Sequence, residues 1–172
     1  MLRRITDLLS NSVPRPASLD WAEVERLLGT ALPGDYRNWC KTFPLVYLNE
    51  YLMVLHPLNG VDNVRAHIDF AHRWSAGRSD RFPFDLYPVP GGLLGWAFTD
   101  DGAQCWWRTD GHPDEWTVVV TDRMEAPYWE FNGGMVDFIA SVLEEKVVCP
   151  IFTEDFPRAY PDEPIKVTLV GQ

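Results

Sequence analysis

The sequence predicts an α+β fold, in which an antiparallel sheet of about five or six strands carries N-terminal helices and a C-terminal helix. Three observations support this class. Residues 93–122 hold three runs rich in aromatic and β-branched residues, separated by short turn clusters. Apolar residues recur at helical spacing in several segments before this region. One more segment of this kind follows it, over residues 135–146.

The region 93–122 predicts a three-stranded antiparallel meander. Its strands are expected over residues 93–99, 103–109 and 115–121, because the Asp-Gly pairs between them favour tight hairpin turns. Alternation along these strands places one set of side chains on a common face: Leu94, Trp96, Phe98, Cys105, Trp107, Trp116, Val118 and Val120. We expect the helix over residues 135–146 to cover this face. The opposite face is not plainly polar either.

Further helices and strands are expected on both sides of the meander. Apolar spacing predicts N-terminal helices over residues 1–10, 21–28, 35–43 and 61–74. Asp20 precedes the second of these helices as an N-cap, and Gly29 follows it as a C-terminal cap. The remaining β-prone segments predict a hairpin or bent strand pair at 46–56, a short strand at 128–131 and an edge strand at 165–170.

The length and composition predict one domain over residues 1–172, large enough to bury a core without disulfides or metals. Residues 147–172 are expected to form a proline-punctuated acidic tail. No apolar run approaches the length of a bilayer span, and the N-terminus lacks the hydrophobic stretch of a secretory signal. The 3 cysteines are odd in number and widely separated, which favours buried, reduced thiols in a cytoplasmic protein.

The net charge of −10 lies entirely in the C-terminal part of the chain. Residues 1–92 carry 10 Arg and Lys against 10 Asp and Glu, whereas residues 93–172 carry 5 against 15. Such a lopsided acidic field disfavours nucleic-acid binding and favours a basic protein partner. A purely solubilising role for these acids explains the composition equally well.

Acidic residues in the two turns of the meander are the candidate partner-binding residues: Asp100, Asp101, Asp110, Asp114 and Glu115. Turn formation alone also favours Asp at such positions. Trp106 is a further candidate, as an exposed aromatic anchor, because adjacent strand residues face opposite ways. At least one of Trp106 and Trp107 is therefore expected in the core. A place beneath a helix or the tail is the alternative for Trp106.

The sequence contains no local motif for nucleophilic catalysis, phosphate binding or metal binding. His67 and His72 are too far apart round a helix to chelate a metal as a pair, and solvated or half-buried side chains fit them better. A hydrolase site assembled from distant residues, such as a histidine with Cys105 or Cys149, stays open as an alternative. We expect no catalytic centre, no cofactor and no metal.

Short motifs follow one another in a fixed order between residues 91 and 143. They are Gly91 to Trp96, Thr99 to Gly102, Trp107 to Gly111, Pro113 to Trp116 and Phe138 to Leu143. Together they resemble the SUKH superfamily, a group of bacterial immunity proteins and related cell-wall-assembly regulators. The resemblance covers residues 88–146, with a weaker echo at 32–36.

This resemblance implies a SUKH-like fold and a non-catalytic role. An immunity protein of this kind would bind and neutralise a cognate toxin, commonly a nuclease. The first alternative is a regulatory scaffold of the cell-wall-regulator type, and the second is the small hydrolase considered above. An acidic surface is complementary to the basic groove of a nuclease, so the charge distribution agrees with the first role. The sequence does not define the oligomeric state.

Overall fold

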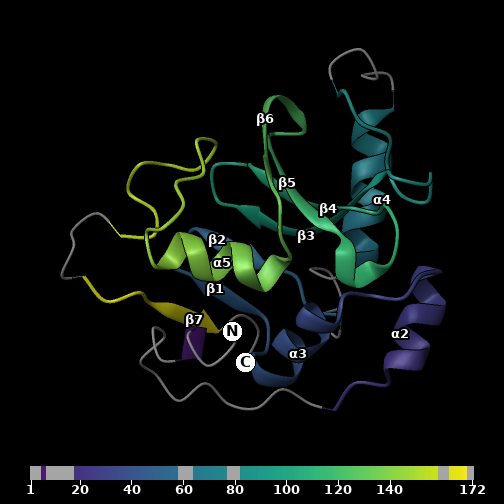
Figure 1. The fold of residues 1–172 in the computed structure, drawn as a ribbon, viewed down its shortest axis with the longest axis horizontal. Coiled ribbons are helices and arrows are strands. Elements are labelled where there is room, and N and C mark those ends of the chain that lie inside the picture. The colour runs from purple at the N-terminus through teal and green to yellow at the C-terminus, as the bar shows by residue number, and fades with distance from the viewer. Residues whose placement is uncertain (1–4, 7–17, 58–63, 77–81, 159–162, 170–172) are drawn as a thin grey trace.

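The computed structural model describes residues 5–6, 18–57, 64–76, 82–158 and 163–169 (Figure 1). Its strands are β1 (Val46–Leu48), β2 (Leu52–Val54), β3 (Leu93–Thr99), β4 (Gln104–Arg108), β5 (Thr117–Asp122), β6 (Glu125–Phe131) and β7 (Val167–Leu169). Its helices are α2 (Trp21–Leu28), α3 (Gly34–Thr42), α4 (Val64–Ser75), α5 (Met135–Leu143) and the short 3₁₀ helix η1 (Pro113–Glu115). Within these ranges no helix has the length and apolar character needed to span a bilayer.

The strands form one antiparallel sheet in the order β6-β5-β4-β3-β2-β1-β7. The predicted α+β class is therefore confirmed, although the sheet has 7 strands and the prediction was for five or six. The hairpin predicted at 46–56 is β1 and β2, turned through Asn49 and Glu50 with φ of 49° and 52°. The predicted edge strand at the C-terminal end is β7, which pairs with β1.

A large aromatic core lies on one face of the sheet, beneath α3 and α5 (Figure 1). Trp96 packs edge-on against Phe138 of α5 at 6.1 Å between ring centroids. Trp107 receives Tyr36 of α3 edge-on at 5.0 Å. Both tryptophans are fully buried, which confirms their predicted core positions and the predicted cover by α5. Parts of the tail join this core through Phe152, Phe156 and Ile165.

A β-bulge in β3 changes which residues share a face. Gly95 pairs with Trp106 and Ala97 with Cys105, so Trp96 is the extra residue between two pairs of the ladder. Beyond the bulge the alternation is shifted by one residue. Phe98 therefore lies on the face of Trp106, and its prediction on the face of Trp96 was wrong.

A smaller core occupies this second face of the sheet, under α4 and the segment that precedes β3. It consists of Ala71, Phe82, Leu86, Leu93, Trp106, Val119 and Met124. Trp106 is fully buried there, and its Nε1 donates a hydrogen bond to Thr121 Oγ1 at 3.0 Å. The prediction of an exposed aromatic anchor at Trp106 is thereby corrected, because α4 covers this side chain. His67 of α4 is also buried, and so it is neither solvated nor half-exposed.

The remaining sequence predictions differ from the structure only locally. The strand predicted to begin at Glu115 begins at Thr117, because Pro113–Glu115 form η1 with His112 as its cap. Asp20 caps α2 by accepting a hydrogen bond from Glu23 N at 3.2 Å, and Gly29 ends it with φ of 78°. Most of the helix predicted over residues 1–10 lies outside the described residues.

Candidate functional site

The structure divides the predicted acidic residues between the two ends of strand β4. Asp100 and Asp101 lie in the turn before β4 and form the Asp100 end. The Asp114 end, formed by Asp110, Asp114 and Glu115, lies in the connection between β4 and β5. Since β4 has 5 residues, it separates the two ends by roughly 15 Å. The candidate site is thus two acidic clusters and not one.

Hydroxyl groups hold the carboxylates at the Asp100 end. Tyr47 donates a hydrogen bond from its OH to Asp100 Oδ1 at 3.1 Å. Asp101 accepts hydrogen bonds from Tyr51 OH at 3.1 Å and from Thr99 Oγ1 at 2.5 Å. Burial, together with the hydrogen bond to Asp100, raises the pKa of Tyr47 to about 12, so this phenol stays a donor. Both carboxylates are therefore held in place as hydrogen-bond acceptors.

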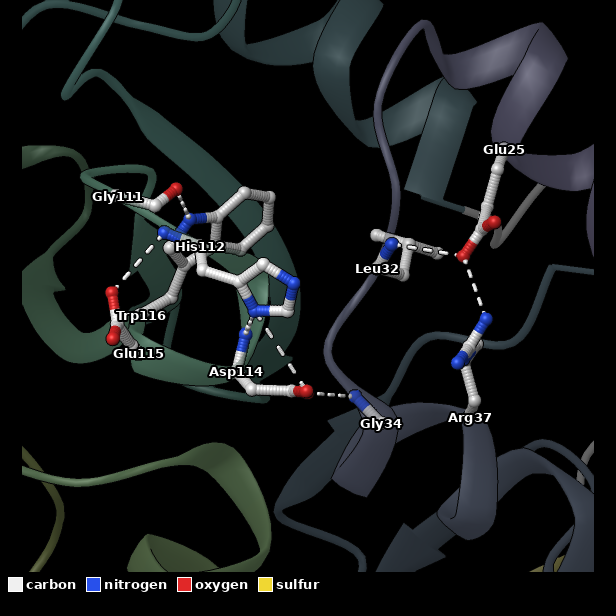
Figure 2. A network of polar contacts seen from close by, with 9 residues as sticks. All are labelled: Glu25, Leu32, Gly34, Arg37, Gly111, His112, Asp114, Glu115 and Trp116. Atoms are coloured by element: carbon white, nitrogen blue, oxygen red, sulfur yellow. Dashed lines mark hydrogen bonds and ion pairs between the residues drawn. The ribbon is translucent and has the colours of Figure 1, made fainter.

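The Asp114 end is anchored to the N-terminus of α3 (Figure 2). Asp114 Oδ1 accepts a hydrogen bond from Gly34 N at 2.6 Å, where the helix N-terminus favours a negative charge. His112 Nδ1 accepts from Asp114 N at 3.3 Å, and Glu115 Oε2 accepts from His112 N at the same distance. Trp116 Nε1 donates to Gly111 O at 3.4 Å. The Asp114–Gly34 contact joins the connection to α3, and the other three hydrogen bonds hold the connection together internally.

A second carboxylate fixes the neighbouring link between α2 and α3 (Figure 2). Glu25 Oε1 accepts hydrogen bonds from Leu32 N at 3.0 Å and from Arg37 Nη1 at 3.3 Å. Glu25 thereby joins α2 to the link that follows it and to α3. Polar contacts therefore hold both the β4–β5 connection and the neighbouring α2–α3 link.

Sequence reasoning did not identify Asp35 as a member of this region. Its Oδ2 accepts a hydrogen bond from Val136 N at 3.0 Å, and its Oδ1 accepts from Tyr36 N at 2.6 Å. Burial raises the pKa of Asp35, and the nearby charge of Asp114 adds to the effect. A signal for this contact exists in the sequence, because the N-cap residue of α5 is Gly134, which has no side chain to cap the helix.

The described cysteines are free, buried thiols. Burial raises the pKa of Cys40, Cys105 and Cys149, the last to about 11, so all three remain protonated at neutral pH. His56 Nε2 lies 3.4 Å from the carbonyl oxygen of Cys40, and burial lowers the pKa of His56. Among the described residues no group of three or more His, Cys, Asp or Glu side chains is placed to hold a metal ion.

Comparison with known proteins identifies the family. The family model SUKH_6, described as SMI1-KNR4 cell-wall, matches residues 18–139. The chain belongs to this SUKH family. The predicted superfamily assignment is confirmed, and the match extends the resemblance toward the N-terminus, to include α2 and α3. No curated protein and no solved structure gave a match.

The SUKH match includes both acidic ends and the residues that anchor them. It stops within α5, before the tail and β7. Partner binding by Asp100, Asp101, Asp110, Asp114 and Glu115 stays a prediction. Asp114 has a role in the fold in addition, because it joins the β4–β5 connection to α3.

Proposed function

We propose that this SUKH chain is a non-catalytic protein-binding module of the immunity type, which captures a basic toxin, such as a nuclease, and blocks it. The observation that carries this proposal is the fixed placement of exposed carboxylates at both ends of β4. Asp100 is exposed and accepts a hydrogen bond from Tyr47 OH at 3.1 Å. Asp114 accepts one from Gly34 N at 2.6 Å while 62% of its side chain stays exposed. Charges placed before binding lose little conformational entropy when a partner arrives.

Electrostatics favours a basic partner. The C-terminal part of the chain, with 15 acidic against 5 basic residues, includes both acidic ends. A surface of this kind repels the phosphate backbone of nucleic acids and attracts a protein whose own groove binds phosphate. Such complementarity accelerates association and lets an inhibitor compete with the nucleic acid for the same groove.

The state of the thiols supports binding over catalysis. A nucleophilic cysteine needs a thiolate, yet burial raises the pKa of Cys40, Cys105 and Cys149. The same free thiols suit the reducing cytoplasm, where an immunity protein would meet its toxin. The hydrolase alternative would require a nucleophile outside this set.

A regulatory scaffold of the cell-wall type is the second candidate. The description of the matching family model, SMI1-KNR4 cell-wall, favours it. A scaffold of this kind would use the same acidic ends to bind cellular proteins that are not toxins. The two candidates therefore differ in what the partner does, and not in the surface that binds it.

Affinity capture followed by a toxicity assay separates these candidates. The full chain is used as bait in its native cells, and the retained proteins are identified at low and at high ionic strength. We expect a basic protein that high salt releases. Expressed alone, this protein should arrest growth, and co-expression of the chain should restore it. A harmless partner supports the scaffold, whereas retention of no basic protein contradicts both candidates.

A further inference from the structure

A row of cross-strand neighbours crosses the sheet on the face that carries α4. The register pairs Tyr47 with Thr168 on one side and with Met53 on the other. Met53 pairs in turn with Phe98, and Phe98 pairs with Gln104. Directly paired residues in an antiparallel sheet point to the same side. Tyr47, Met53 and Phe98 therefore stand side by side on one face.

Three of these neighbours and one helical residue form an incompletely covered apolar surface, here named the sheet patch: Tyr47, Met53, Phe98 and Phe70. The three strand residues are half-buried, and Phe70 of α4 is 42% exposed. His67 joins the two parts, because its ring lies 5.9 Å from Phe70 and 6.3 Å from Phe98. In Figure 1, α4 lies beside β3 and β4, far from β7.

Negative charge borders the sheet patch. Asp100, whose carboxylate lies 3.1 Å from Tyr47 OH, belongs to the Asp100 end. Glu50, in the β1–β2 turn, is exposed and lies close enough for its charge to add to the raised pKa of Tyr47. The patch thus combines aromatic and thioether side chains with two carboxylates.

Several described cations lie round this region. Arg123 donates a hydrogen bond from Nε to Asp101 O at 3.3 Å, and Arg73 is exposed one helical turn beyond Phe70. Two others face carboxylates. Lys166 Nζ, next to β7, lies 3.9 Å from Glu163. Arg65 of α4 lies 3.5 Å from Asp69. At the Asp100 edge of the patch, the carboxylates of Asp100, Asp101 and Glu50 outnumber the one guanidinium of Arg123. This edge therefore keeps an excess of negative charge.

We infer that the sheet patch, with Asp100 and Glu50 at its edge, is the surface on which a basic protein docks. An apolar side chain of the partner would cover Met53 and Phe70, and an Arg or Lys would pair with Asp100. Aromatic and Met side chains are enriched at such interfaces, with charges at the rim. The inference rests on the proposed function for the kind of partner, and it selects the Asp100 end as the docking side.

The Asp114 end is less suited to docking. Asp114 already neutralises the N-terminus of α3, and Glu115 accepts a hydrogen bond from the backbone of His112. These carboxylates contribute to the field that attracts a partner. Direct pairing with an Arg or Lys would compete with contacts that hold the fold.

A defined probe tests the docking surface without the natural partner. The probe is a blocked peptide of alternating Arg and Leu, added to the full ¹⁵N-labelled chain and followed by NMR. We expect the largest saturable shifts at Tyr47, Met53, Phe70 and Asp100. The variants Phe70→Ser and Asp100→Asn should each weaken binding roughly two- to fivefold. Matched control variants Val148→Ser and Glu154→Gln, at exposed positions elsewhere, should bind as the wild type does.

Three outcomes overturn the inference: largest shifts at Asp110–Glu115, shifts distributed over all acidic segments, or no saturable shift. A peptide with Glu in place of Arg should cause no shift, and equal binding of this peptide would also contradict the charge argument. Failure here is distinct from failure of the proposed function. A toxin captured from cells whose affinity is unaffected by Phe70→Ser would leave the function standing and reject the patch. Peptide binding at the patch, with no basic protein captured from cells, would support the patch and reject the proposed function.

Discussion

Asp35 caps helix α5 from a position 101 residues earlier in the chain, by accepting a hydrogen bond from Val136 N at 3.0 Å. Gly134, the N-cap residue of α5, offers no side-chain acceptor of its own. Asp35 lies in the first turn of α3, so one carboxylate joins the two helices that cover the main core. The same first turn receives Asp114 through Gly34. The first turn of α3 therefore contacts both the start of α5 and the acidic β4–β5 connection.

Loss of this cap should destabilise the fold. We expect Asp35→Ala to lower the free energy of unfolding by about 1–2 kcal/mol, as for other N-cap deletions. Asp35→Asn should cost less, because it keeps an acceptor oxygen and burial already disfavours the charged carboxylate, as its raised pKa shows. Urea unfolding of both variants measures this order. Equal stability of Asp35→Ala and the wild type would show that the contact contributes nothing.

The central tryptophans should dominate stability. Trp107 is fully buried between Tyr36, Trp96 and Trp116. Trp107→Ala should therefore lower the free energy of unfolding by about 3–5 kcal/mol. Tyr128, which is 48% exposed on edge strand β6, provides the control, and Tyr128→Ala should change stability by less than about 1 kcal/mol. Similar losses in the two variants would contradict the assignment of the core.

Gly95 should be required for α4 to pack against the sheet. A Cβ atom at this position would come within 2.5 Å of His67 Cδ2. Gly95→Ala should therefore cost about 1–3 kcal/mol through overpacking. In a double-mutant cycle with His67→Ala the two losses should not add, because the smaller side chain removes the clash. Additive losses would show that the two residues do not meet in solution.

His67 should make the fold sensitive to acid. Burial lowers the pKa of His67 from 6.5 to about 4, so the unfolded chain binds a proton more readily than the folded one. Stability from this group is fully present above pH 6.5 and is lost as the pH falls toward 4, by roughly 3 kcal/mol in all. Urea midpoints between neutral pH and pH 4 measure the slope.

His67→Asn supplies the control for this titration, because its side chain is polar but does not ionise. Its stability should fall less steeply than that of the wild type over the same pH range. His56 also has a pKa lowered by burial and is present in both chains, so its contribution cancels in the comparison. Identical slopes in the two proteins would exclude His67 as the source of acid sensitivity.

Local patterns predicted most of the fold. The strand at 93–99 and the helix starting at 135 follow from apolar periodicity alone, and the cap at Asp20 follows from residue type. The bulge at Trp96 was missed, because it depends on pairing with β4 and the sequence of β3 alone does not indicate it. Uninterrupted alternation along β3 therefore predicted the wrong face for Phe98.

The candidate site was less predictable, because it depends on tertiary contacts. Residue type showed that the meander turns are acidic, but the distance between the two ends appears only once β4 is built. Trp106 looked like an anchor in isolation, whereas α4 covers it. The sheet patch was missed for a similar reason: Tyr47, Met53 and Phe98 come together only through the register of three strands.

The claim that the acidic ends capture a basic protein is central, and the salt dependence of the association rate tests it most directly. The protein retained from native cells is purified and mixed with the chain by stopped flow at increasing ionic strength. A triple variant replaces Asp100, Asp101 and Asp110 by Lys, and it keeps Asp114 because that residue holds Gly34. A control variant likewise replaces Glu154 and Asp155 by Lys, because both residues are exposed in the tail.

We expect the association rate constant of the wild type to fall by about tenfold or more from low to high ionic strength, because salt screens the attraction. The triple variant should associate more slowly at low ionic strength, and its rate constant should depend less on salt. The rate constant of the control variant should stay closer to that of the wild type. An association rate that is independent of salt and unchanged in the triple variant would contradict the account.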